Sequence, residues 1–224
     1  MKTVILCYHK IGFEPEEGRF LNCSPDQLAS HAKFFNRKGW KGLLPRDFID
    51  ERKSGICFTF DDAYVSAIEN APTVLERFGF RGAFYVVPSL VGKTSSWDGD
   101  IARPLAGWDE LLAIAARGHE LGNHTLSHPR LDGLPVADQE RELLEASRLM
   151  KERGIEAQSV AFPYGVFNLD TFLAMTKSGI KVGLALGKRP VGDEPANCLP
   201  RIVVGYSDSV AKLLYKIFIR PKLP

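Results

Sequence analysis

The sequence has little charge imbalance, few cysteines and no long apolar run. Its formal net charge of +2 is too small to indicate a nucleic-acid or strongly anionic partner. The four cysteines are spread along the chain without a CxxC pair, which argues against a zinc–thiolate site and against a disulfide framework. Cys7 and Cys57 lie in apolar runs, and we expect them to be buried as small hydrophobic residues.

The apolar segments are all too short to span a bilayer, and the segment Val4–Cys7 is shorter than the core of a signal peptide. We therefore expect a cytoplasmic protein without a transmembrane segment. The 224 residues, 45% hydrophobic and 25% charged, suffice for one large core. Because no repeat, low-complexity tract or linker divides the chain, we expect a single domain over residues 1–224.

Apolar strand-like runs alternate with amphipathic helical segments along the chain. This alternation predicts an α/β fold with a parallel sheet and right-handed crossovers. Ser24 followed by Pro25 is a typical helix start. The predicted strands are Val4–Cys7, Ile56–Phe60, Ala83–Val87, His119–Thr125, Ser159–Phe162, Lys181–Leu186 and Ile202–Val204. The predicted helices are Ser24–Lys38, Tyr64–Phe78, Trp108–Arg117, Val136–Arg153, Leu169–Ser178 and Ser209–Arg220.

Two short segments after predicted strands contain the residues best suited to chemistry. Thr59-Phe60-Asp61-Asp62 ends with adjacent carboxylates, and His124-Thr125-Leu126-Ser127-His128 places two imidazoles four residues apart. One carboxylate and two imidazoles would give three ligands to a divalent ion. The other carboxylate would act as a base beside that ion, which predicts metal-assisted hydrolysis. Alternatively, the aspartates cap a helix and the histidines belong to a turn.

With these motifs the chain resembles the polysaccharide deacetylase family, carbohydrate esterase family 4, over nearly its whole length. The aspartate pair matches the family's TFDD motif, and the histidine pair matches its H-[ST]-x-x-H motif, preceded by the similar lead-in Gly118–Asn123. Phe162-Pro163-Tyr164-Gly165 resembles the core of the third motif. Tyr8-His9 and Leu199-Pro200-Arg201-Ile202 are similar to a subgroup that acts on exopolysaccharide-type amino sugars.

The resemblance implies a single distorted (β/α) barrel of seven or eight units that removes N-acetyl groups from amino sugars. The substrate would be a poly- or oligosaccharide, or a lipid-linked glycan. By position, Asp61 would be the general base, and Asp62, His124 and His128 would bind Zn²⁺, with Co²⁺ or Ni²⁺ as alternatives. Pro163-Tyr164-Gly165 would line the substrate groove, and a backbone N–H near Tyr164 would help to bind the oxyanion.

The chain departs from the family pattern at two positions. Ala161 stands where the family usually has the arginine that orients the base, and no histidine follows His128, although many members supply a general-acid histidine late in the chain. We predict that Arg201 replaces the missing arginine as the partner of Asp61; the alternative is an ordinary surface charge. We predict that His9 is the general acid; the alternatives are a structural role and proton donation by Asp61.

Several other residues have roles that the sequence leaves open. Trp97 and Tyr164 are candidate platforms for a sugar ring, although Trp97 alternatively only anchors its own loop. We expect His119 to be buried and structural, and His31 to lie on an outer helix in or near solvent. The basic amphipathic helix Ser209–Arg220 either packs on the barrel or contacts a membrane surface peripherally.

The predicted function is therefore a metal-dependent carbohydrate N-deacetylase. One rival is a catalytically silent relative that binds a glycan or a metal without turnover, which the two departures would explain. A second rival keeps the chemistry but acts on a non-sugar amide or a formamide.

Overall fold

Parallel strands form a closed barrel in the computed structural model, which describes residues 3–49, 53–187 and 197–220. Its seven strands are β1 (Val4–Tyr8), β5 (Ile56–Phe60), β6 (Gly82–Val86), β7 (Glu120–Asn123), β8 (Ser159–Ala161), β9 (Val182–Leu186) and β10 (Cys198–Val203). β1 pairs with β5 on one side and with β10 on the other, and this double pairing closes the sheet. The predicted barrel of seven or eight units is confirmed.

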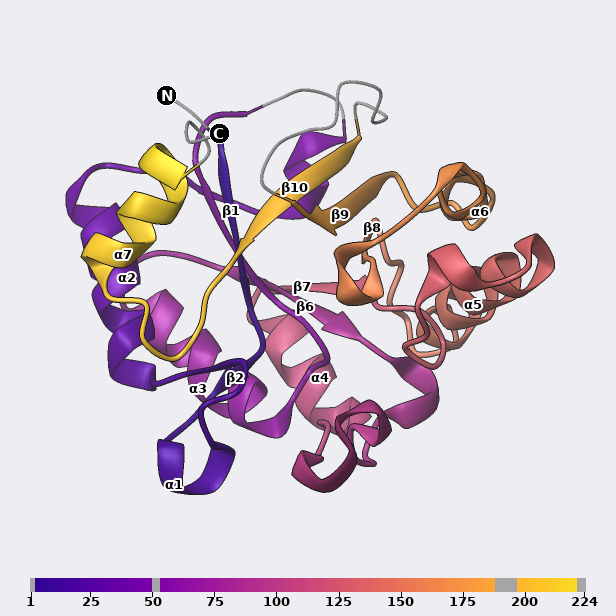
Figure 1. Cartoon of the computed structure of the whole chain (residues 1–224), viewed down its shortest axis with the longest axis horizontal. Coiled ribbons are helices and arrows are strands. Elements are labelled where there is room, and N and C mark those ends of the chain that lie inside the picture. The colour runs from indigo at the N-terminus through magenta and orange to yellow at the C-terminus, as the bar shows by residue number, and fades with distance from the viewer. Residues whose placement is uncertain (1–2, 50–52, 188–196, 221–224) are drawn as a thin grey trace.

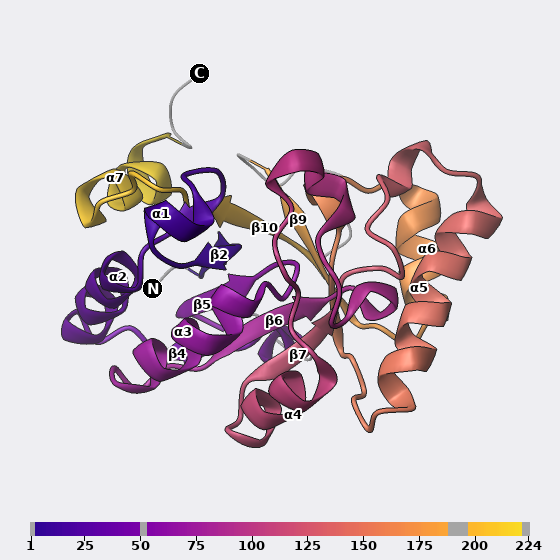
Figure 2. The same ribbon diagram turned by 90° about the horizontal axis from the view of Figure 1, so that it is seen from below.

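Helices connect the strands and cover the outside of the barrel (Figure 1). They are α2 (Pro25–Arg37), α3 (Val65–Glu76), α4 (Trp108–Ala116), α5 (Val136–Lys151), α6 (Leu169–Lys177) and α7 (Val210–Leu214). α5 and α6 pack side by side on one side of the molecule, and α2 and α3 pack together on another (Figures 1 and 2). As predicted, Ser24 caps α2, because its side chain accepts a hydrogen bond from the Gln27 N–H.

The alternation of side chains along each strand separates two apolar layers. Outward-facing residues such as Leu6 and Phe58 join the large core beneath the helices. Inward-facing residues such as Ile5, Cys57 and Tyr85 fill the barrel together with Phe48 of the 3₁₀ turn η1 (Pro45–Phe48). The barrel is therefore packed below its carboxyl-terminal mouth, which is where parallel α/β barrels place their sites.

The inward register leads directly to the functional residues. On β5 it passes through Cys57 and Thr59, so the next inward position is Asp61, just beyond the strand. The same alternation carries β1 to His9 and β7 to His124. The alternation of side chains along the strands therefore places Asp61, His9 and His124 at the same mouth of the barrel.

Some predicted elements differ from the structure. The last strand begins at Cys198 rather than Ile202, so Arg201 lies within β10; proline is rare inside strands, and Pro200 obscured the pattern. The predicted helix Ser209–Arg220 is α7 followed by a π-helical turn over Tyr215–Ile219. The short elements α1 (Glu14–Glu17), β2 (Lys10–Ile11), β3 (Asn22–Cys23) and β4 (Gly42–Leu43) were not predicted.

The segment of α7 and the π-helical turn, residues 210–219, packs on the barrel as well. Leu213 and Ile217 are buried in the large core, whereas Tyr215, Phe218 and Ile219 are exposed. This packing agrees with the first of the two predicted roles for the segment, and membrane contact stays a prediction. In the described part of the chain, no helix combines the length and apolar character that crossing a bilayer requires.

Candidate metal centre and active site

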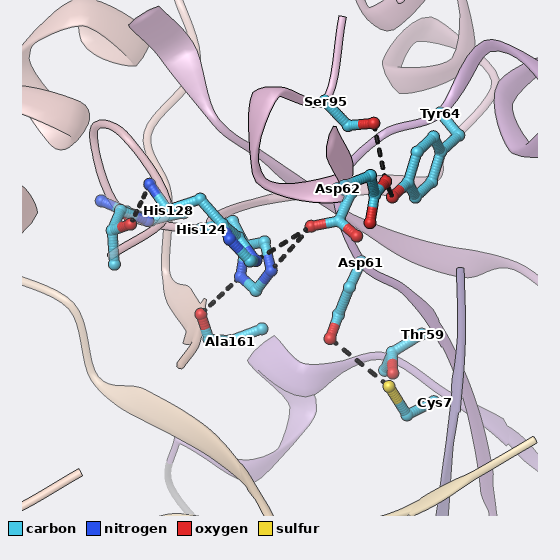
Figure 3. Close-up of polar contacts among 12 residues, drawn as sticks. Cys7, Thr59, Asp61, Asp62, Tyr64, Ser95, His124, His128 and Ala161 are labelled. Atoms are coloured by element: carbon cyan, nitrogen blue, oxygen red, sulfur yellow. Dashed lines mark hydrogen bonds and ion pairs between the residues drawn. The ribbon is translucent and has the colours of Figure 1, made fainter. Parts of the chain in front are cut away.

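Three side chains converge at the carboxyl-terminal mouth of the barrel (Figure 3). Asp62 follows β5, and His124 and His128 follow β7. The Nε2 atoms of His124 and His128 lie 3.2 Å and 3.3 Å from one oxygen, Asp62 Oδ1. All three residues are buried, and their ligand atoms form a compact group that could hold a metal ion. The structure therefore brings the predicted metal ligands together.

The chemistry of this group fits a cation. His124 Nδ1 lies 2.7 Å from the carbonyl oxygen of Ala161, so Nδ1–H donates to that carbonyl and the neutral ring keeps its lone pair on Nε2. This lone pair faces Asp62 Oδ1, a buried atom without a hydrogen-bond partner among the described residues. Two acceptors so close together repel each other unless a proton or a metal ion lies between them.

The electrostatics of His124 support the same conclusion. Burial on its own lowers the pKa of His124, but the carboxylates of Asp61 and Asp62 outweigh this effect and raise it. The mouth of the barrel thus has a negative potential that favours a bound cation. Asp62, His124 and His128 are the residues that would hold a divalent ion.

Arg201 holds the carboxylate of Asp61 in place. Its Nη1 donates to Asp61 Oδ1 at 2.6 Å and its Nη2 to Oδ2 at 2.8 Å, while Nη1 also lies 3.1 Å from Thr59 Oγ1. The predicted contact between Arg201 and Asp61 is confirmed. Burial on its own raises the pKa of Asp61, but the buried Arg201 guanidinium brings that pKa down to about 2. Asp61 is therefore ionised at neutral pH and fixed in orientation.

His9 lies next to this carboxylate. One of its ring nitrogens is within 4.8 Å of both an Asp61 oxygen and Cys7 Sγ. Burial lowers the pKa of His9, even though the carboxylates of Asp62 and Asp61 act in the opposite direction. The two carboxylates therefore do not bring this pKa above its ordinary value. The position of His9 agrees with the prediction of a general acid, and the role itself stays a prediction.

The loops of the site are strained. Six non-glycine residues of the described chain have positive φ, and all except Leu21 lie in these loops: Asp62 (71°), Ala63 (56°), Thr125 (65°), His128 (65°) and Tyr164 (59°). Each such residue costs about 1–3 kcal/mol. The left-handed turn at Asp62 has a clear use, because two adjacent residues of a continuing strand would face opposite sides of the sheet. The turn instead brings both aspartates to the mouth.

Two aromatic rings border His128. Trp97 stacks on it with ring centroids 4.0 Å apart, and Tyr164 meets it edge-on at 5.0 Å. Tyr164 is 53% exposed and offers a surface to a sugar ring, whereas His128 covers one face of Trp97. The loop of Trp97 is fixed by its neighbour Asp98, which accepts a 2.6 Å hydrogen bond from Tyr64.

The segment Pro163-Tyr164-Gly165 forms a tight turn at the rim of the site. Pro163 and Gly165 are buried, and only Tyr164 extends into solvent. Gly165 has a φ of 72°, and a Cβ atom there would lie 2.1 Å from Leu186 Cβ. Only glycine fits this position, so the turn that presents Tyr164 depends on it.

The two remaining histidines are buried and form hydrogen bonds elsewhere in the protein. His119 is buried as predicted; its Nδ1 accepts a hydrogen bond from the Gly82 N–H, and its Nε2 lies 3.1 Å from Glu76. The expectation that His31 lies in or near solvent is wrong. His31 is fully buried because it shares the inner face of α2 with Leu28, and it bonds to the Tyr8 hydroxyl at 3.0 Å.

Comparison with known proteins identifies the chain. The family model for polysaccharide deacetylase matches residues 49–183, which is more than half of the sequence and includes Asp61, Asp62, His124 and His128. The chain belongs to the polysaccharide deacetylase family. His9 and Arg201 lie outside the matched residues, so their assignment depends on the geometry described above.

Individual polysaccharide deacetylase relatives are distant in sequence. YxkH of Bacillus subtilis is 24% identical over 191 residues, which cover 82% of this chain but only 64% of that protein. A poly-beta-1,6-N-acetyl-D-glucosamine N-deacetylase of Staphylococcus aureus is 23% identical over 210 residues, covering 86% of this chain and 70% of the relative.

Solved structures of other deacetylases share the fold. Streptococcus pyogenes deacetylase PplD superimposes with a TM-score of 0.81 at 20% identity, covering 96% of this chain and 98% of PplD. IcaB from Ammonifex degensii gives a TM-score of 0.79 at 22% identity, with 95% of each chain covered. At these identities the likeness establishes the architecture alone.

Sequence reasoning missed several residues that support the site. The backbone carbonyl of Ala161 holds the His124 ring in orientation. Because every residue type has such a carbonyl, the sequence could not predict this contact. Glu142 on α5 accepts hydrogen bonds from the Ser127 N–H and hydroxyl at 2.9 Å and 2.8 Å, which anchors the histidine loop. A buried glutamate on an otherwise charged helix resembles its exposed neighbours in sequence.

Proposed function

We propose that this member of the polysaccharide deacetylase family removes N-acetyl groups from amino sugars in a poly- or oligosaccharide, and that the reaction depends on a divalent ion at Asp62, His124 and His128. One observation supports this best: two imidazole nitrogens converge on one carboxylate oxygen directly beside a second carboxylate, Asp61, that Arg201 keeps ionised. This arrangement places a cation site and a base together.

A divalent ion held there would polarise the acetamide carbonyl and lower the pKa of the attacking water. Asp61 would accept the proton from that water, because the bidentate contact with Arg201 leaves it ionised and oriented. The backbone N–H at Tyr164 would donate to the oxyanion of the tetrahedral intermediate. A positioned base typically contributes about 10²–10⁴-fold to the rate.

The leaving amine needs a proton as the intermediate collapses. A ring nitrogen of His9 lies within 4.8 Å of an Asp61 oxygen, and His9 is not one of the three residues of the cation site. We propose that His9 donates this proton, after taking it from Asp61, which received it from the attacking water. Asp61 is the competing donor, because it holds the proton of the attacking water at that stage.

The substrate proposal follows from the rim of the site and from the relatives. Tyr164 is exposed beside His128 at the mouth of the barrel and offers a ring on which a pyranose can stack. The name of the Staphylococcus aureus relative specifies poly-β-1,6-linked N-acetylglucosamine. We therefore propose a polymer or oligomer of N-acetylglucosamine, with a lipid-linked form as a further candidate.

The test is acetate release from β-1,6- and β-1,4-linked N-acetylglucosamine oligomers. Protein stripped with a chelator should be inactive, and one equivalent of Zn²⁺, Co²⁺ or Ni²⁺ should restore turnover. Asp61→Asn provides the matched control, because it should bind the ion without releasing acetate. A small acetanilide and a formamide, assayed in parallel, test the non-sugar alternative.

The silent-relative alternative makes a different prediction in the same assay. Two departures from the family pattern suggested a silent relative: Ala161 in place of an arginine, and the lack of a histidine after His128. Arg201 compensates for the missing arginine, because it contacts Asp61. If the metal-loaded protein binds the oligomers but releases no acetate from any of these substrates, the silent relative is correct and the proposed activity is wrong.

A further inference from the structure

A second group of converging ligand atoms lies beside the predicted metal site. Cys7 Sγ, a ring nitrogen of His9 and a carboxylate oxygen of Asp61 are all within 4.8 Å of one another. Cys7 and His9 reach this point because both follow the inward register of β1. Among the described residues, this group and that of Asp62 are the two that could hold a metal ion.

The distances are close to those that a metal requires. The Cys7 thiol already donates to Asp61 Oδ2 at 3.4 Å (Figure 3). In a tetrahedral zinc site, with Zn–S about 2.3 Å and Zn–O about 2.1 Å, the sulfur and oxygen ligands are about 3.6 Å apart. His9 Nδ1 is buried and has no hydrogen-bond partner in the described part of the chain, so no such bond at Nδ1 opposes a small rotation of the ring.

We propose that Cys7, His9 and Asp61 bind a second, thiophilic divalent ion such as Zn²⁺ or Cd²⁺, and that this ion inhibits the enzyme by occupying the base. The inhibition rests on the proposed function, because it requires Asp61 to be the base. On binding, the Cys7 S–H bond breaks, a metal–sulfur bond forms and the proton passes to solvent.

The second ion should bind more weakly than the first. Arg201 contacts both oxygens of Asp61, so an ion at Asp61 must approach a guanidinium. A carboxylate oxygen has two lone pairs, so Oδ2 can bind the ion with one lone pair and accept the hydrogen bond from Arg201 Nη2 with the other. The positive charges of the ion and the guanidinium nevertheless repel each other. A first ion at Asp62 adds to that repulsion. Inhibition is therefore expected only when the ion exceeds one equivalent.

The first experiment measures binding without activity. Metal-free protein is titrated with Co²⁺, whose bond to a thiolate gives a charge-transfer band in the near ultraviolet. We expect no such band with the first equivalent and its appearance with excess Co²⁺. Cys7→Ser should lose the band. Cys57→Ser is the matched control, because Cys57 is also buried in the barrel interior, and it should retain the band.

The second experiment measures inhibition. Acetate release is followed as Zn²⁺ is raised above one equivalent, with each variant compared with its own rate at one equivalent. Wild type and Cys57→Ser should be inhibited, whereas Cys7→Ser should need at least about tenfold more Zn²⁺, because the site loses its thiolate. If Cys7→Ser does not fold, ¹¹³Cd NMR of the wild type should show a second resonance with the shift of a one-sulfur site.

The outcomes separate the two proposals. A band that never forms, or one that persists in Cys7→Ser, overturns the second site. Equal inhibition of wild type and Cys7→Ser, or activation by excess Zn²⁺, overturns the inhibitory role. If the chain releases no acetate at one equivalent of any ion, the proposed function and the inhibition fail together, and the Co²⁺ titration still decides whether the second site exists.

Discussion

Replacing Arg201 with methionine should strongly destabilise the protein, because Asp61 would keep its charge in a buried place without a counterion. Both members of the pair are almost fully buried, and two hydrogen bonds of 2.6 Å and 2.8 Å join them. Breaking a buried pair from one side typically costs about 3–5 kcal/mol. We expect Arg201→Met to lower the free energy of unfolding at pH 7 by about that amount.

The pH dependence of this loss can be derived from the pKa of Asp61. In the wild type, the pKa of Asp61 in the folded state is about 2 and lies below its ordinary value of 3.8. The difference corresponds to about 2–3 kcal/mol of stability, present above pH 4 and lost as the pH falls through the folded pKa. Without Arg201, burial raises the folded pKa above the ordinary value. The difference in free energy of unfolding between the wild type and Arg201→Met should then become smaller as the pH falls from 7 to 5.

Urea unfolding followed by tryptophan fluorescence, with chelator present, measures these free energies. Asp61→Asn/Arg201→Met is the control, because replacing both charged members of a buried pair is often nearly neutral. It should recover at least about 2 kcal/mol relative to the sum of the single variants. Two results would contradict this prediction: a loss of unfolding free energy in Arg201→Met that is the same at pH 7 and pH 5, or a double variant whose loss equals the sum of the losses of the two single variants.

Four further predictions concern the metal, the base, the acid and the surface. His128→Ala should lose the bound ion, measured by metal analysis, because one of three ligands is gone; full occupancy would contradict the ligand assignment. Asp61→Asn should retain the ion but lose nearly all acetate release, whereas retained turnover would make another residue the base. His9→Ala should lower kcat about a hundredfold at unchanged metal occupancy, and an unchanged kcat would transfer the acid role to Asp61. Tyr215→Ser/Phe218→Ser should weaken cosedimentation with anionic vesicles if the exposed end of the chain contacts membranes, and equal cosedimentation of wild type and variant would exclude this contact.

The parts of the site that the sequence predicted are those that depend on strand ends. Asp61 and His124 follow buried strands in an α/β pattern, and the carboxyl ends of such strands meet at one mouth. The contact of Arg201 with Asp61 was also predicted, from the resemblance to the family: Ala161 stands where the family usually has the arginine that orients the base.

The parts that sequence could not predict depend on contacts between distant segments. The burial of His31 depends on the Tyr8 hydroxyl and on the backbone of Asp208, which lies 177 residues further along the chain. The stacking of Trp97 on His128 depends on how its loop folds back, for which the residue types give no signal. The lowered pKa of His9 depends on the loss of water around its ring in the closed barrel.

The closure of the barrel also determines when the site can exist during synthesis. Asp61 and Arg201 are separated by 140 residues, and Arg201 lies on the last strand to be inserted, between β1 and β9. Until β10 leaves the ribosome, the base has no counterion, and burying it would cost several kcal/mol. A nascent chain that ends before Cys198 should therefore keep the mouth of the barrel open to water, with Asp61 hydrated. Insertion of β10, rather than any segment near Asp61 in sequence, gives the base its counterion.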